Sequence, residues 1–240
     1  MKIRLSFLIA LTFIFFGNSS FSHPGRTDSN GGHYNRSTSV YHCHSNACSD
    51  LTGDEAVNNK GIKRYNRKDW KHWIDEDRDC QNTRAEVLIS QSQARVEFAT
   101  SRDCRVLKGS WIGQLTGVLL TNASDIDIDH VIPLSYAHRH GGFSWSSSKK
   151  EQFANDPLNL LPTYDIENRK KSDKGPSEYL PSNKNLACAY IKRWQAIRIK
   201  YGLNIAPNDK VIIQNTISNT SKESYCQSNS LTILILLKAL

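Results

Sequence analysis

The stretch that most constrains the fold is residues 125–135, in which apolar and acidic side chains alternate until a proline is reached. This period of two predicts a short β-strand that ends at Pro133. The alternation puts Asp127 and Asp129 on one face of the strand, opposite the isoleucines. His130 follows where the strand ends. The sequence therefore predicts a strand that delivers carboxylates and an imidazole to one place.

A second short strand and a helix are predicted some thirty positions later. Residues 158–161 form an apolar run that we expect to be a strand ended by Pro162. Asp165 can cap a following helix, and a Gly-Pro pair at Gly175 is expected to stop it. This order places Asn168 in the first turn of that helix, downstream of the strand that carries the acids.

These residue types are the parts of a one-metal nuclease. Phosphodiester hydrolysis needs a deprotonated water and charge neutralisation at the phosphate. His130 suits the first task because the ordinary pKa of histidine lies near working pH. Asp129 and Asn168 offer the oxygen ligands that Mg²⁺ prefers. We expect contacts to nucleic acid from four basic side chains: Arg84, Arg169, Lys171 and Lys174.

In order and spacing, these residues resemble the HNH (ββα-metal) endonuclease superfamily, in the variant in which asparagine replaces the last histidine. The similarity covers roughly residues 63–203 and is closer to a family of secreted bacterial HNH endonucleases. It implies that His130 is the general base and that Asn159 braces the loop that orients it. It also implies that Asp129 and Asn168 bind the metal. Such an Asp/Asn pair favours Mg²⁺ or Mn²⁺ over Zn²⁺.

The first residues predict export. Two positive charges, an apolar run over residues 5–16 and the small residues Ser20 and Ser22 indicate a signal peptide, residues 1–22, cleaved before His23. The apolar run is short for a membrane anchor, so we expect no membrane span after cleavage. Cleavage lowers the formal charge from +8 to +6, since the segment carries two basic residues and no acid. The mature protein is expected in the periplasm or the medium.

The six cysteines of the chain are an even number in an oxidising compartment, where disulfides are the expected state. Among the possible pairings we favour Cys80–Cys104, Cys188–Cys226 and a local Cys43–Cys48 loop. Ligation of zinc by these thiols is the alternative, but no Cys-x-x-Cys pair occurs.

Residues 23–52 differ from the rest because turn-forming residues and histidines dominate them. The segment resembles the small "YHYH" segments of exported bacterial proteins. It can hold Zn²⁺ or another transition metal. The alternative is a polar loop around the Cys43–Cys48 bridge. Its candidate ligands are His23, Asp28, His33, His42 and His44.

The remaining pattern predicts an α+β fold. Helical periodicity is clear at 82–90 and at 186–201, where Gly202 ends the second helix. Short strands are expected at 95–98 and 104–107. His138 and His140, in a Gly-rich stretch, are interpreted as loop or DNA contacts.

We expect an HNH ββα-metal core embedded in a mixed α/β domain, preceded by the small His-rich loop module. Residues 208–230 are polar and expected to be peripheral, and the apolar run at 231–237 is either a last strand or a tail. The predicted organisation is a signal peptide, a His-rich module, a nuclease domain and a C-terminal extension, at residues 1–22, 23–52, 63–206 and 207–240.

The leading functional prediction is a secreted, metal-dependent endonuclease of low sequence specificity that acts on DNA, with RNA left open. Two alternatives remain: a catalytically silent nucleic-acid-binding protein and a metal-binding envelope protein. The oligomeric state does not follow from the sequence.

Overall fold

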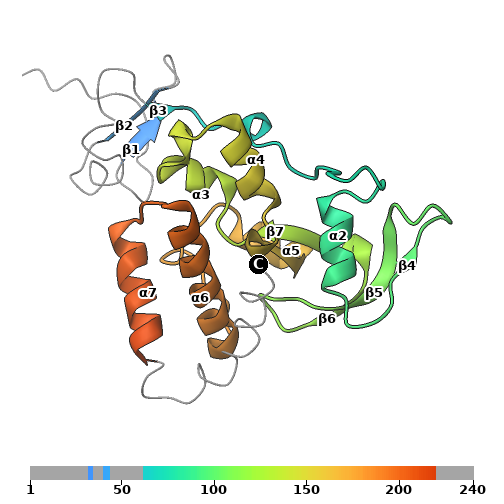
Figure 1. Ribbon diagram of the computed structural model, residues 1–240. Coiled ribbons are helices and arrows are strands. Elements are labelled where there is room, and N and C mark those ends of the chain that lie inside the picture. The colour runs from blue at the N-terminus through green and yellow to red at the C-terminus, as the bar shows by residue number, and fades with distance from the viewer. Residues whose placement is uncertain (1–31, 35–39, 44–61, 220–240) are drawn as a thin grey trace, which may run out of the picture.

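The computed structural model describes residues 32–34, 40–43 and 62–219 (Figure 1). The predicted signal peptide, most of the His-rich module and the apolar run at 231–237 lie outside these residues. Within the described part, no helix is both long and apolar enough to cross a membrane.

The described strands form small antiparallel sheets. In the first, His33 and His42 lie opposite each other in register. The second is a meander and the third is a strand pair. The strands are β1 (Gly32–Tyr34), β2 (Val40–Cys43), β3 (Ile62–Lys63), β4 (Glu97–Phe98), β5 (Val106–Ile112), β6 (Leu119–Asn122), β7 (Ile126–His130) and β8 (Leu160–Tyr164).

Helices and short 3-10 turns connect the strands, and the α+β class is confirmed. The α-helices are α2 (Thr83–Ser90), α3 (Leu134–Arg139), α4 (Ser147–Asn155), α5 (Asp165–Lys171), α6 (Lys184–Tyr201) and α7 (Pro207–Asn219). The 3-10 turns are η1 (Arg67–Asp69), η2 (Ala123–Asp125), η3 (Gly142–Ser144) and η4 (Pro157–Asn159).

Both strongly periodic helices form where the sequence predicts them. The Asn82 side chain caps α2 by accepting a hydrogen bond from Ala85 N at 3.1 Å. Gly202 ends α6 in the left-handed conformation, with φ of 67°. The capping residues predicted from the sequence therefore begin and end these helices in the structure.

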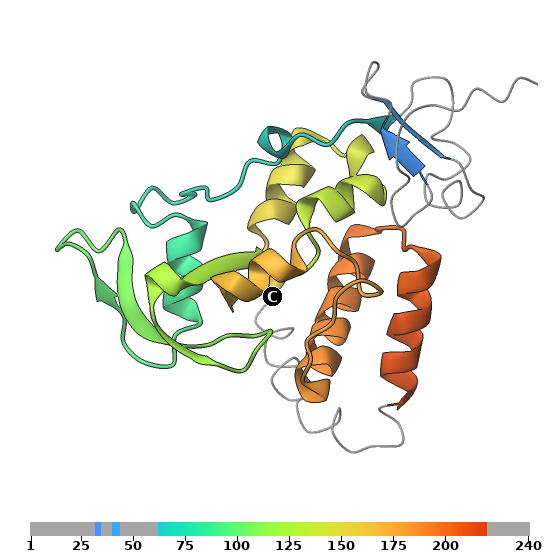
Figure 2. The same cartoon turned by 180° about the vertical axis from the view of Figure 1, so that it is seen from behind.

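Strand β7 passes between two hydrophobic cores. Ile126 and Ile128 belong to the core around Trp111, and Val131 and Ile132, just after the strand, belong to a larger core around α6. Figure 1 shows β7 and α5 in the middle of the molecule, with the β4–β5–β6 sheet on one side and α6 and α7 on the other. The view from behind shows the same separation (Figure 2). Asp129 and His130 thus lie on a segment that is fixed from both sides.

The second predicted strand is wrong in its bounds. Residues 157–159 form η4, and β8 runs from Leu160 through Pro162, which pairs with Ile128. Proline is compatible with this strand because β8 lies at the edge of a two-stranded sheet. Helix α5 also ends earlier than predicted, at Lys171, because Ser172 adopts a positive φ of 52°.

The prediction that residues 208–230 are peripheral is wrong for their first half. Helix α7 buries Ile213 in the larger core. Asp209 is also buried, where it accepts hydrogen bonds from the Tyr136 hydroxyl at 2.6 Å and from Ser177 N at 2.7 Å. The prediction is based on the high polar content of this segment. From sequence alone, a buried acid whose oxygens accept hydrogen bonds cannot be told from an acid on the surface.

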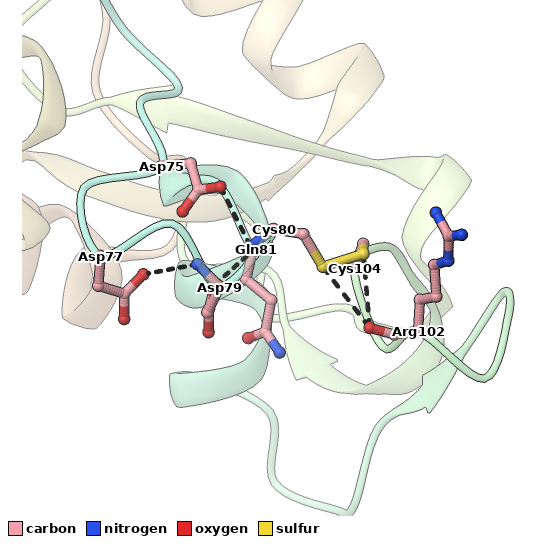
Figure 3. The surroundings of a disulfide bond; sticks show 7 residues. All are labelled: Asp75, Asp77, Asp79, Cys80, Gln81, Arg102 and Cys104. Atoms are coloured by element: carbon pink, nitrogen blue, oxygen red, sulfur yellow. Dashed lines mark hydrogen bonds between the residues drawn. A yellow bond between two sulfur atoms is a disulfide. The ribbon is translucent and has the colours of Figure 1, made fainter.

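The Cys80–Cys104 disulfide is confirmed (Figure 3). It joins the loop before α2 to the β4–β5 hairpin across 24 positions of sequence. Cys188 is also disulfide-bonded. Its predicted partner Cys226 and the Cys43–Cys48 pair fall on side chains outside the described residues.

Replacing both Cys80 and Cys104 by serine is expected to lower the free energy of unfolding by about 3 kcal/mol, because the cross-link closes a loop of this size in the unfolded chain. Urea denaturation of the two proteins measures the difference. Reduced wild-type protein should lose at least as much, because reduction also breaks the disulfide of Cys188. Equal stability of oxidised wild type and the double variant would contradict the structural role of this bond.

Candidate active site

The predicted strand–loop–strand–helix arrangement is present. Strand β7 pairs with β8 so that Asp129 lies opposite Leu161 and His130 opposite Leu160. Helix α5 begins directly after β8 and packs on both strands. One short helix therefore faces the acidic side of β7.

Asp129 and Lys171 form a buried ion pair across this interface. The Lys171 side chain is fully buried, and its ammonium donates to Asp129 Oδ1 at 3.0 Å and to the carbonyl of His130 at 2.8 Å. Burial raises the pKa of Asp129, and Lys171 opposes that shift. Among the described residues, Asp129 Oδ2 is buried without a hydrogen-bond partner. One carboxylate oxygen thus remains available to a cation.

Asn168 lies one turn before Lys171 on α5, and its amide is oriented by Asp127. The Asn168 Nδ2 group donates to Asp127 Oδ2 at 3.0 Å. Because a carboxylate only accepts hydrogen bonds, the amide nitrogen must face Asp127. Among the described residues no hydrogen bond to the amide oxygen of Asn168 is found, so this oxygen can serve as a ligand.

His130 is buried and held as a neutral ring. Its Nε2 lies 2.8 Å from the carbonyl oxygen of Ala154, so Nε2 must carry the hydrogen and Nδ1 the lone pair. Burial lowers the pKa of His130 to about 3. The ring of Trp73 lies against it, with centroids 5.8 Å apart. The imidazole is thus arranged to accept a proton at Nδ1.

Asn159 fixes the chain just after His130. The side chain is fully buried, and its Oδ1 accepts from Ile132 N at 2.9 Å. Its own carbonyl accepts from Val131 N at 2.9 Å. These two bonds restrain the backbone after His130, and the bracing role implied by the resemblance stays a prediction.

Asp129, His130 and Asn168 line one pocket of about 400 Å³. The structure therefore brings the three predicted residues together. The sequence does not predict some other residues that line this pocket. Some lie far from the motif in the chain, and others lie within the motif but are not of a typical catalytic residue type. These include Tyr65, Arg67 and Ser135.

The predicted nucleic-acid contacts separate into two groups. Arg169 lines the pocket, whereas Lys174, which follows α5, does not line it and donates from its ammonium to the Lys170 carbonyl at 2.8 Å. Lys171 points inward, as described above. Arg84 also has internal partners, because its guanidinium donates to the carbonyls of Ala123 and Ile126 at 3.0 and 2.7 Å. The last two side chains are thus committed to protein contacts in this structure.

His138 and His140, predicted to be loop or DNA contacts, are buried in the protein. His140 stacks on the ring of Tyr136 at a centroid distance of 3.7 Å, and its Nδ1 lies 2.7 Å from the Tyr136 carbonyl. The prediction is wrong because His138 on helix α3 and His140 at its C-cap are both buried despite the neighbouring glycines.

Three exposed acids, Asp75, Asp77 and Asp79, also lie close together (Figure 3). One oxygen of each accepts a backbone N–H of the same loop, the donors being Cys80, Asp79 and Gln81. These bonds account for the cluster as a loop structure that leads into the Cys80–Cys104 disulfide.

Comparison with known proteins decides the family. Residues 82–214 match the family described as GmrSD restriction endonucleases, C-terminal domain. The chain belongs to this family. The GmrSD C-terminal domain match contains β7, β8 and α5, so the pocket lies largely within a nuclease-related domain.

An uncharacterized secreted protein of Arthroderma benhamiae is 34% identical over 156 residues, which are 64% of this chain and 74% of that protein. No solved structure matches. The relative's description is consistent with the export predicted for this chain.

Replacing Lys171 by methionine is expected to lower the free energy of unfolding at pH 7 by about 3–5 kcal/mol, because Asp129 is left as an unpaired buried charge. The folded-state pKa of Asp129 then lies above its unfolded value of about 4, so the loss should shrink as the pH falls toward that value. Urea denaturation at several pH values measures this.

The same substitution combined with Asp129→Asn removes both charges and should recover most of the loss. A Lys171→Met protein as stable as wild type at pH 7, or equally destabilised at every pH, would contradict the role of the ion pair.

Proposed function

We propose that this protein is a metal-dependent endonuclease of the HNH type that hydrolyses phosphodiester bonds of DNA. The observation that carries the proposal is the convergence of Asp129, His130 and Asn168 on one pocket, on a strand–strand–helix unit within a restriction-endonuclease family domain. A catalytically silent binding protein would not need a neutral histidine beside an unpartnered carboxylate oxygen.

The donor set fits a hard divalent cation. Among the described residues, Asp129 Oδ2 is a buried carboxylate oxygen without a hydrogen-bond partner, and the Asn168 amide turns its nitrogen to Asp127, which leaves its oxygen for a cation. Oxygen ligands of this kind suit Mg²⁺ or Mn²⁺, whereas Zn²⁺ prefers imidazole or thiolate. When bound, such a cation neutralises the phosphate and stabilises the leaving oxygen.

His130 supplies the base. Its Nδ1 takes a proton from the attacking water, and the positive ring that results is stabilised by the hydrogen bond from Nε2 to the Ala154 carbonyl. Because Asn159 holds the backbone that follows His130, the ring keeps its direction while the proton moves. The proposed cation ligand Asp129 and the proposed base His130 are thus adjacent residues at the end of β7.

The charge of the chain and the secreted relative support the proposed substrate and compartment. The chain carries a formal charge of +8, or +6 after the predicted cleavage, and this positive excess favours a polyanion. The predicted signal peptide, the disulfides and the secreted relative support action outside the cytoplasm. We propose DNA as the substrate, cut with low sequence specificity, and test RNA alongside it.

The purified full-length mature protein is expected to cut plasmid DNA in millimolar Mg²⁺ or Mn²⁺ and to stop in EDTA. His130→Ala should lower the rate by about 10²–10⁴-fold because the general base is lost. Asp129→Asn should lower it strongly as well. Cleavage of supercoiled plasmid, linear DNA and RNA, followed on gels, measures these rates.

Asp125→Asn is the matched control, since Asp125 is an exposed acid of the same segment that does not line the pocket. It should cut like wild type. A folded His130→Ala protein that keeps more than about a tenth of the wild-type rate would overturn the assignment.

A separate metal site is proposed for the His-rich module, because His33 and His42 lie opposite each other in register. Imidazole-rich sites hold transition metals far more tightly than oxygen sites hold Mg²⁺. Zinc or a similar ion should therefore copurify with wild type and be lost from the His33→Ala/His42→Ala variant. Elemental analysis of both proteins measures this, and equal metal content would contradict it.

A further inference from the structure

The wall of the pocket includes a segment that precedes the family domain. Tyr65 and Arg67 line the pocket with His130 and Asn168, although the family match begins at residue 82. The site is therefore completed by residues some sixty positions before the catalytic strand.

The backbone of Arg67 is fixed even though its side chain is exposed. Asn66 Oδ1 accepts from Lys68 N at 3.0 Å, which caps the turn η1. The Arg67 carbonyl accepts from Trp70 N at 3.0 Å, and Trp70 is fully buried in the larger core. The guanidinium is thus presented from an anchored turn.

Arg67 also differs from the other pocket arginine in its charge partners. Arg169 pairs with Asp165 at 2.8 Å. No carboxylate of the described residues lies within ion-pair distance of Arg67. Its side chain lines the same pocket as His130 and Asn168. The guanidinium therefore borders the space in which the proposed base and metal ligand lie.

The acids of the pocket already have cationic partners. Asp129 pairs with Lys171, and Asp173 pairs with Arg139 at 2.9 Å. A phosphodiester that enters the pocket brings a negative charge that these groups do not match. A planar guanidinium without an acid partner is the side chain best suited to bind two phosphate oxygens.

We propose that Arg67 binds the phosphate that is cleaved, and so completes the active site from outside the family domain. The inference rests on the proposed nuclease function. It implies that the smallest active unit begins before residue 67 rather than at residue 82.

The test compares Arg67→Ala and Arg67→Lys with Lys68→Ala in the full chain. Lys68 is the neighbouring exposed cation and does not line the pocket. The plasmid cleavage rate of Arg67→Ala should fall by about 10²–10³-fold, as for loss of one transition-state charge partner. Arg67→Lys should be intermediate, and Lys68→Ala should stay within about twofold, since a solvated charge contributes little.

Binding provides a readout that is independent of cleavage. In a His130→Ala background with EDTA, adding Arg67→Ala should reduce by about one unit the slope of log affinity for a short DNA duplex against log salt. Circular dichroism should be unchanged, because the Arg67 side chain is exposed.

Two failures are distinguishable. If wild type cuts DNA and Arg67→Ala cuts as fast as Lys68→Ala, this inference is overturned and the proposed function stands. If wild type cuts no nucleic acid with any of the metals tried, both are overturned.

Discussion

The buried contact between Lys171 and Asp129 joins helix α5 to strand β7, and the geometry of the site depends on it. Asn168 lies on the same helix one turn earlier, so this contact also sets where its amide lies relative to Asp129. Burying two charges costs several kcal/mol for each ion unless both are matched. Here the ammonium also donates to the His130 carbonyl, while one Asp129 oxygen has no described partner. That oxygen is the group that a cation would satisfy.

Packing around β7 turns this contact into a rigid site. The strand passes from one hydrophobic core to the other, and Asn159 holds the backbone directly after His130. Rigid elements thus carry the proposed base and both proposed metal ligands, whereas Arg67 reaches the pocket from an anchored turn. This arrangement suits a site in which the reacting groups need a fixed geometry and the phosphate is bound by the exposed Arg67.

The sequence predicts strand β7 well because alternation, a proline stop and the order of Asp129, His130 and Asn168 are local signals. It does not predict the direction of Lys171, because a run of basic residues looks like a solvated helix face. Arg67 carries no local signal, since only the tertiary fold brings it to the pocket. The inward turn of His138 likewise depends on core packing that polar neighbours conceal.

The central claim is that Asp129 and Asn168 form the cation site beside His130. A crystal of the wild-type protein grown with Mn²⁺ and measured for anomalous scattering tests it most directly. The account predicts an anomalous peak in contact with Asp129 Oδ2 and the amide oxygen of Asn168, with His130 Nδ1 facing the same space. A fully occupied peak at the exposed Asp75, Asp77 and Asp79 loop, with none at Asp129, would contradict it.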